Sequence, residues 1–400
     1  MTITDLDYDL NETERAIRDT TRRFADGTLR PAGIELDKMD PEAAIAKDSV
    51  YWDVFKQYQS LGLSYVDPEL SLMEQARWKI IVCEEMAKGD VGLALGLGVT
   101  EFPHMAAAMT GNQELMAKFP PTLLGCWAIT EPDHGSDRVD FDENEMSPDS
   151  KRSRYNCIAR ADGNEYVISG QKSAWVSNGS IAEAAALYCG VETNDGTTGC
   201  GVFVVPLDAP GVSRGKPLNK LGQRSLNQGE IFFDDVRVPA DYMVAGPEVY
   251  SHLTNLTLVN ANCLMGVSFA AVAMAALELA LDYAKERKQG GVPIIQHQSV
   301  KARLFEMYRK TEVARSIARR AYCYNMASGT PDLAIAITSK ITCTKTAFEV
   351  ASEAVQIFGG AGISREYPVE KLFRDARLSM IEDGCNEVLG LIGGDLLAAA

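Results

Sequence analysis

The residues best suited to chemistry in this sequence are hydroxyls, glycines and carboxylates rather than histidines or cysteines. Thr130 and Ser177 carry hydroxyls at the ends of strand-like segments. Gly359 and Gly360 follow Gln356 at the end of a helical pattern, where the backbone N–H groups of a loop can reach a pyrophosphate. A plain helix stop is the alternative explanation for the two glycines. These residues could therefore hold a phosphate-bearing ligand through hydrogen bonds.

Other catalytic patterns lack support. Gly211-Val-Ser-Arg-Gly215 fits G-x-S-x-G, but Pro210 and Pro217 exclude the strand and the helix that a serine-hydrolase elbow needs. No G-x-G-x-x-G follows a strand and no G-x-x-x-x-G-K-[ST] occurs, so a Rossmann nicotinamide site and a P-loop are not supported. The four histidines lack metal-ligand spacing, and the nine scattered cysteines are expected to be reduced core thiols. We therefore expect no metal.

Three segments must position these residues, and together they predict an α+β protein. Residues 1–122 are expected to form a helical domain, beginning at a capping-box pattern of Asn11 and Glu14. Residues 123–240 are expected to form a β-sheet domain, because apolar residues there alternate or form short runs between turn residues. Residues 241–400 return to helical spacing and are expected to form a bundle. The clearest strand-like runs are Tyr166–Gly170, Gly201–Pro206 and Glu230–Asp234, and the clearest helical runs are Ala270–Ala284 and Ala347–Phe358.

The composition is that of a globular protein with a large core. Of 400 residues, 46% are hydrophobic and 24% are charged. The formal net charge of −16 argues against binding to nucleic acid or to an anionic membrane surface. The first residues lack the basic and apolar regions of a secretory signal, so we expect a cytoplasmic protein. The apolar stretch Val267–Leu281 is too short to span a membrane and predicts a buried helix, whereas the polar run 138–154 predicts a surface loop.

Three separated segments carry a resemblance to a known family. Trp127-Ala-Ile-Thr-Glu-Pro-Asp-His-Gly-Ser-Asp137 is similar to the pattern T-E-P-x-x-G-S-D. Gly170-Gln-Lys-Ser-Ala-Trp-Val-Ser-Asn-Gly179 is similar to G-x-K-x-[WY]-[IV]-[ST]-N-G. Residues 356–377 are similar to a third pattern, Q-x-x-G-G-x-G-[YF]-x-[RK]-E-x-P-x-E-[KR]-x-x-R-D-[AS]. In this order and at this spacing, the segments resemble the acyl-CoA dehydrogenase family over nearly the whole chain.

The resemblance implies a fold and a cofactor. The fold has an N-terminal helical domain, a central β-sheet domain and a C-terminal four-helix bundle, and the cofactor is FAD. By the family's pattern, Thr130 and Ser177 would hydrogen-bond the pyrimidine edge and N5 of the isoalloxazine, and Trp175 would pack against the ring. Ser136 would approach the thioester ligand closely. A hairpin with an aromatic cross-strand pair is the alternative explanation for the segment around Trp175 and Ser177.

The resemblance also implies an oligomer. In the family, the contact made by Gln356, Gly359 and Gly360 goes to the cofactor of a neighbouring subunit. Arg287 and Gln298 match positions that do the same. Sites shared in this way imply a homo-oligomer, usually a tetramer.

A carboxylate base is the remaining requirement of the family's reaction. The register set by Arg374-Asp-Ala-Arg377 places Asp383 where the family has its catalytic Glu, and places Gly384 at the family's Gly beside the substrate. Asp can act as a general base, but it is one methylene shorter than Glu. The alternative is a surface carboxylate at a helix start. Asp90 offers a second carboxylate near the expected acyl pocket, where it could remove a proton farther from the carbonyl; a helix cap is its alternative role.

Three positions depart from the family's pattern. Asn262 stands where the family commonly has an Arg that lines the pantetheine, so that a CoA contact is expected to be missing. The segment Arg287–Gly291 lacks the Phe of R-x-x-F-G, and Cys385 replaces the Thr that follows the catalytic Glu and Gly. These departures leave the expected fold intact, but they leave the substrate and the reaction open.

The leading hypothesis is a FAD-dependent acyl-CoA dehydrogenase that gives an enoyl-CoA, with Asp383 as base and an electron-transfer flavoprotein as the acceptor of electrons. A second hypothesis is a flavin oxidase or oxygenase of the same fold, acting on a carbon acid without CoA. Asp at the base position and Asn262 both fit this alternative. A third is a catalytically inactive flavoprotein that serves as a binding subunit.

Overall fold

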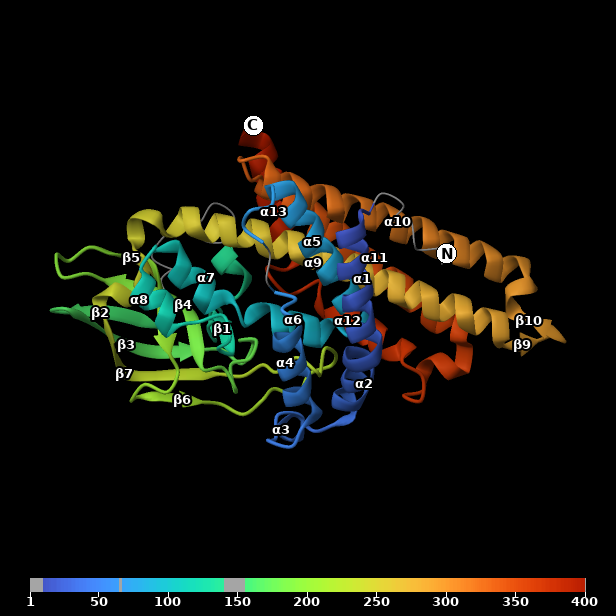
Figure 1. Cartoon of the computed structure of the whole chain (residues 1–400), viewed down its shortest axis with the longest axis horizontal. Coiled ribbons are helices and arrows are strands. Elements are labelled where there is room, and N and C mark those ends of the chain that lie inside the picture. The colour runs from blue at the N-terminus through green and yellow to red at the C-terminus, as the bar shows by residue number, and fades with distance from the viewer. Residues whose placement is uncertain (1–9, 65–66, 140–154, 400) are drawn as a thin grey trace.

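The computed structural model describes residues 10–64, 67–139 and 155–399, so that most of the predicted surface loop 138–154 lies outside the described residues. The chain runs from helices to a sheet and back to helices (Figure 1), and this confirms the predicted architecture. The first group contains α1 (Glu12–Phe24), α2 (Arg30–Lys38), α3 (Pro41–Ala44), α4 (Val50–Leu61), α5 (Leu72–Gly89), α6 (Val91–Val99), α7 (Phe102–Met109) and α8 (Gln113–Lys118). The last group contains α9 (Pro247–Glu286), α10 (Gln298–Ala327), α11 (Leu333–Phe358), α12 (Val369–Leu378) and α13 (Asn386–Ala399).

The capping box at the start of α1 is confirmed. The Asn11 side chain accepts a hydrogen bond from the Glu14 backbone N–H at 2.9 Å. The Glu14 carboxylate in turn accepts from the Asn11 N–H at 2.9 Å. Two backbone donors that the helix itself leaves unpaired are thereby satisfied, which fixes where the first helix begins.

The sheet fills the middle of the chain. Its strands are β1 (Gly125–Ala128), β2 (Ile158–Asp162), β3 (Glu165–Lys172), β4 (Ala184–Glu192), β5 (Thr198–Pro206), β6 (Val212–Arg214), β7 (Ile231–Pro239) and β8 (Met243–Ala245). Their order is β6-β7-β3-β2-β4-β5-β8, with β1 paired in parallel to β4. The predicted runs Tyr166–Gly170 and Gly201–Pro206 lie in β3 and β5, and Glu230–Asp234 lies in β7 apart from its first residue. Strand β8 corrects the expectation of helix immediately after Pro239, because its backbone pairs with β5 at the sheet edge.

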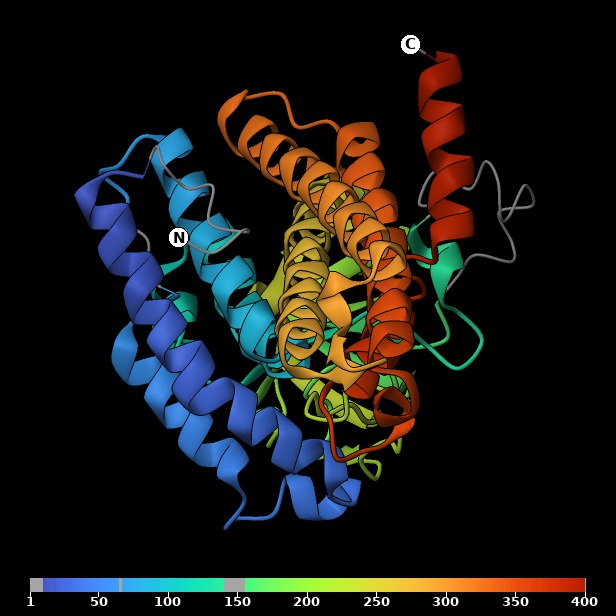
Figure 2. The ribbon, with the colours of Figure 1, turned by 90° about the vertical axis from the view of Figure 1, so that its right-hand side faces the viewer.

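Three long helices form the centre of the C-terminal part. Helix α9 is 40 residues long and apolar enough to cross a membrane by length and composition, but 78% of its most apolar window is buried inside the protein. The buried helix predicted at Val267–Leu281 is therefore confirmed. Small side chains such as Ala273 and Ala351 are fully buried in one cluster, which lets α9 and α11 pack closely. In Figure 2 the N-terminal helices and α13 lie on opposite sides of this central group.

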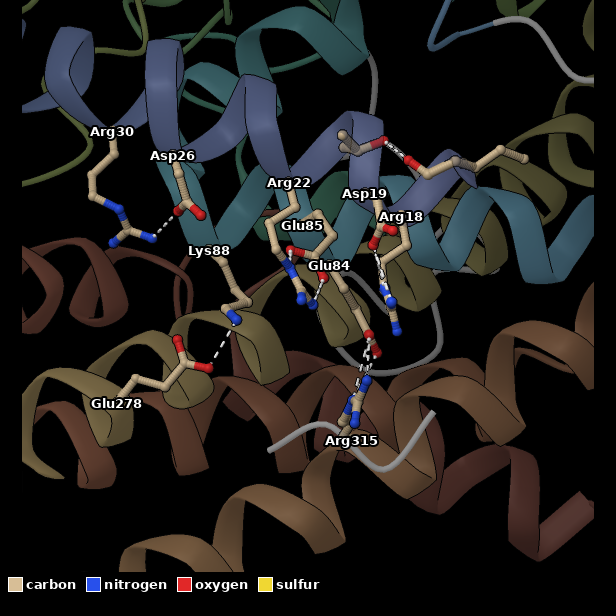
Figure 3. Close-up of polar contacts among 12 residues, drawn as sticks. Arg18, Asp19, Arg22, Asp26, Arg30, Glu84, Glu85, Lys88, Glu278 and Arg315 are labelled. Carbon is tan, nitrogen blue, oxygen red and sulfur yellow. Dashed lines mark hydrogen bonds and ion pairs between the residues drawn. The ribbon is translucent and has the colours of Figure 1, made fainter. Parts of the chain in front are cut away.

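Ion pairs fasten α5 to its neighbours on three sides (Figure 3). Glu84 pairs with two arginines of α10. Arg319 Nη2 is 2.6 Å and Arg315 Nη2 is 3.1 Å from Glu84 Oε2. The Glu84 side chain is 4% exposed. Burial alone would raise the pKa of Glu84, but the two guanidinium groups outweigh burial and lower it. The other ties join Glu85 to Arg22 of α1 at 2.6 Å and Lys88 to Glu278 of α9 at 2.9 Å.

Replacing Glu84 by Gln is expected to destabilise the fold by about 3 kcal/mol, because removing its charge breaks the ion pairs with the buried Arg315 and the partly exposed Arg319. Since the pKa of Glu84 is lowered in the folded state, the wild-type advantage should shrink as the pH falls through that pKa. Urea unfolding followed by circular dichroism measures both effects. Glu306→Gln, which breaks an exposed pair with Arg309, is the matched control. Equal unfolding midpoints for the two variants would contradict the prediction.

Candidate functional site

A cavity of about 1340 Å³ lies between the sheet, α5 to α7, α9 and the turn before α13. A pocket for one organic ligand usually measures about 300 to 1000 Å³, so this volume has room for a substrate and part of a cofactor. The cavity brings together six residues that the sequence analysis singled out from distant segments: Thr130, Ser136, Trp175, Ser177, Asp383 and Gly384.

The turn between α12 and α13 holds Asp383 in the cavity. Asp383 has φ 51° and Gly384 has φ 90°, a left-handed conformation that L side chains rarely adopt. A Cβ on Gly384 would also approach Leu389 and Val139 to within about 3 Å. Ser136 Oγ accepts a hydrogen bond from the Cys385 N–H at 3.0 Å. Ser136 therefore joins the loop after β1 to the turn that carries the carboxylate.

Lys340, on α11, supports this turn from the protein interior. Its side chain is fully buried, and Nζ donates to the Gly384 carbonyl at 2.7 Å and to Asn386 Oδ1 at 2.8 Å. Burial lowers the pKa of Lys340 to about 8, although the charge of Asp383 acts in the opposite direction. Nothing in the sequence patterns pointed to this lysine.

The Asp383 carboxylate is half-buried and accepts no hydrogen bond from any residue that the structure describes. Burial raises the pKa of Asp383, and the positive charge of Lys340 partly opposes that rise. A carboxylate with a raised pKa and free oxygens can accept a proton from a bound ligand. The structure thus places Asp383 in the cavity wall rather than on the outer surface.

A chain of hydrogen bonds runs along the cavity wall from Lys220 to Ser177. Lys220 Nζ donates to Gln228 Oε1 at 2.9 Å. Gln228 Nε2 donates in turn to the Trp175 carbonyl at 3.0 Å and to Ser177 Oγ at 3.3 Å. No sequence pattern pointed to Lys220 or Gln228. They orient the two residues expected to contact the flavin.

Glu382 also lines the cavity, next to Asp383. Its carboxylate accepts a hydrogen bond from Gln223 Nε2 at 2.9 Å. Burial raises the pKa of Glu382 to about 7. The site therefore holds two neighbouring carboxylates, of which Glu382 is held by a hydrogen bond and Asp383 is not.

Asp90 lies elsewhere. Its carboxylate accepts the Leu93 N–H at 2.9 Å and so caps α6, which confirms the helix-cap alternative. It also forms an ion pair of 2.6 Å with Lys371 and accepts a hydrogen bond from Ser225 at 2.5 Å. Asp90 is no part of the described cavity wall. Its position therefore argues against the substrate-binding and second-base roles considered from sequence.

Asn262 stands behind the turn that carries Asp383. It is fully buried, and Nδ2 donates to the Leu258 carbonyl at 3.0 Å and approaches the Asp383 carbonyl at 3.5 Å. Its Oδ1 is buried without a hydrogen-bond partner among the described residues. The short amide thus contacts the backbone of the turn from behind instead of extending into the cavity as a longer Arg could.

The remaining predicted cofactor residues lie at the other end of the molecule. Figure 1 shows the C-terminal ends of α9 and α11 far from the sheet. Tyr283 stacks on Phe358 with ring centroids 4.0 Å apart, which places the two helix ends side by side. The predicted residues at this end are all exposed, and none belongs to the described cavity wall: Arg287, Gln298, Gln356, Gly359 and Gly360.

The cavity wall fits the isoalloxazine part of FAD. Trp175 is 59% exposed, an unusual state for so large an apolar side chain, and it borders the cavity. An exposed indole beside two hydroxyls, Thr130 and Ser177, offers a face for a planar ring and hydrogen-bonding groups for its polar edge.

The sequence matches family models along almost its whole length. Residues 11–125 match the model described as acyl-CoA dehydrogenase, N-terminal domain. Residues 126–236 match the middle domain and residues 253–397 match the C-terminal domain of the same family.

Individual proteins are similar over the same length. A probable acyl-CoA dehydrogenase of Mycobacterium leprae is 29% identical over 390 residues, covering 95% of this chain and 94% of that protein. A cyclohexane-1-carbonyl-CoA dehydrogenase of Geobacter metallireducens is 29% identical over 398 residues, covering 96% and 97%. The solved structure of butyryl-CoA dehydrogenase from Megasphaera elsdenii has a TM-score of 0.83 and 27% identity, covering 98% of this chain and 100% of that chain.

Proposed function

Because the chain belongs to the acyl-CoA dehydrogenase family of FAD-dependent oxidoreductases, we propose that it oxidises an acyl-CoA thioester to the enoyl-CoA with Asp383 as the base. The observation that carries this assignment is the free carboxylate of Asp383 in the same cavity as Thr130, Trp175 and Ser177. When bound there, FAD supplies the acceptor for the hydride that leaves the substrate.

Residues of the chain perform the steps of the proposed reaction that do not involve the flavin. Asp383 Oδ takes the proton from the carbon next to the thioester carbonyl. The buried positive charge of Lys340 favours the ionised form of Asp383, and its hydrogen bond to the Gly384 carbonyl fixes the direction of the turn. Ser136 holds the same turn through the Cys385 N–H. The left-handed conformation of this turn determines how far the Asp383 carboxylate extends towards the substrate. This matters because Asp is one methylene shorter than Glu.

A homo-oligomer, with four chains as the expected number, is part of the proposal. The support is the group formed by Arg287, Gln298, Gln356, Gly359 and Gly360, whose exposure leaves these residues available to a neighbouring subunit's cofactor. An electron-transfer flavoprotein would accept the electrons.

A second candidate is a flavin oxidase or oxygenase that acts on a carbon acid without CoA. The observation that favours it is Asn262, which is buried behind the turn and so leaves the cavity without the cation expected to contact pantetheine.

An anaerobic titration of the FAD-loaded protein with straight, branched, cyclic and aryl acyl-CoA thioesters tests the proposal. We expect one subset to bleach the visible flavin absorbance, which would also identify the acyl class. Bleaching by no thioester would reject the dehydrogenase, and oxygen consumption with a small carbon acid would then favour the second candidate. Unchanged absorbance with every compound would point to a flavoprotein without catalytic activity.

A further inference from the structure

A charged pair lies in the cavity wall where an acyl chain alone would not need one. Lys79 comes from α5, and Glu101 comes from the link between α6 and α7. Lys79 Nζ and Glu101 Oε2 are 3.9 Å apart, and the two side chains are 24% and 15% exposed. Both residues line the cavity together with Tyr58, whose hydroxyl donates to Glu101 Oε1 at 3.4 Å.

The contacts of Lys79 leave its donors largely unused. Its ammonium donates no hydrogen bond to any residue that the structure describes, and its ion pair with Glu101 is long. Burial alone would lower the pKa of Lys79, but the neighbouring Glu101 outweighs burial and keeps the pKa above its ordinary value. The group therefore stays charged. A charged group beside the apolar side chains of Val82 and Met86 is costly unless something in the cavity accepts its hydrogen bonds.

The pair lies in a group of cavity-lining side chains that also includes Tyr58, Cys83 and Tyr322 and is called here the polar cluster. Cys263 of α9 lines the same cavity. Cys263 follows Asn262, which contacts the Asp383 backbone. The cluster and the base thus face one cavity from different parts of its wall.

We propose that Lys79 and Glu101 bind a hydroxyl group carried by the acyl chain, so that the substrate is a hydroxyacyl thioester. A hydroxyl can accept from the ammonium and donate to the carboxylate, which matches a donor and an acceptor 3.9 Å apart. A carboxylate on the acyl chain would meet Glu101 as a like charge, and a purely aliphatic end would offer no acceptor to the Lys79 ammonium. This inference rests on the dehydrogenase function proposed above.

The test compares kcat/KM for CoA thioesters of matched length whose distal carbon carries a hydroxyl, a carboxylate or only hydrogen. We expect the wild-type protein to prefer the hydroxyacyl thioester over its unsubstituted counterpart by about tenfold at the best chain length. In Lys79→Met and in Glu101→Gln the ratio should fall towards one. Lys56→Met, which changes an exposed lysine on α4, should keep the wild-type ratio.

The outcomes separate the two proposals. Turnover of thioesters without a hydroxyl preference at any length would overturn the hydroxyl site and leave the dehydrogenase standing. Preference for the carboxylate, or an unchanged hydroxyl preference in both variants, would likewise overturn the site. Failure of every thioester to reduce the flavin would overturn both. The comparison of kcat/KM among the thioesters in the wild-type protein tests the proposal even where a variant does not fold.

Discussion

Asp383→Asn should yield a folded, FAD-containing protein that reduces its flavin with an acyl-CoA substrate at least about a hundredfold more slowly. The amide keeps the size of the side chain but cannot take a proton. Because burial raises the pKa of Asp383, the wild-type rate should increase with pH as that carboxyl ionises, and this increase should vanish in the variant. Stopped-flow measurement of flavin bleaching across pH gives both results.

Two further variants locate the base if this expectation fails. Glu382→Gln changes the neighbouring carboxylate in the same cavity, and Asp282→Asn changes an exposed aspartate on α9 as a control. An active Asp383→Asn protein beside an inactive Glu382→Gln protein would make Glu382 the base. Activity in Asp383→Asn together with its loss in Asp90→Asn would revive the distal-proton hypothesis against the observed position of Asp90.

Lys340→Met should also slow flavin reduction by about a hundredfold, since the turn that carries Asp383 loses two hydrogen bonds and a misplacement of about 1 Å can cost that much. The direction in which the pH profile of the rate shifts follows from the charge of Lys340. Lys340 favours ionised Asp383, so its removal raises the pKa of Asp383 further and moves the rising limb of the profile to higher pH.

Lys345→Met, an exposed lysine of the same helix, is the matched control. A purely structural role for Lys340 would lower thermal stability and leave the pH limb where it is in wild type. An unmoved limb in a folded, FAD-loaded Lys340→Met protein would therefore refute the electrostatic part of this prediction.

Much of the architecture could be predicted because its signals are local. The capping residues Asn11 and Glu14 act within one turn, and the apolar spacing in α9 and α11 reports which face is buried. Strand β4 was harder. Eight of the nine residues in Ala184–Glu192 are buried, so it lacks the polar alternation by which a strand with one solvent-facing side is recognised.

The candidate site could be predicted only where a short motif carries it. Thr130, Ser177 and Asp383 each lie in such a motif, and all three face one cavity. The contacts of Lys340, Gln228 and Lys79 are with residues far away in the chain. The spacing of residues within a short segment does not predict such contacts. Asp90 shows the converse difficulty: a carboxylate near the expected pocket is equally suited to capping a helix, and only the fold decides between the two.

The two faces of helix α5 are expected to be under different selective pressures. Lys79, Cys83 and Met86 recur at helical spacing on the face that borders the cavity. Glu84, Glu85 and Lys88, which form ion pairs with α10, α1 and α9, lie on the other side of the same helix. Mutations that reshape the cavity can therefore accumulate on one face while the attachment of the helix is conserved on the other. A scaffold of this kind can evolve towards new acyl groups without first losing stability.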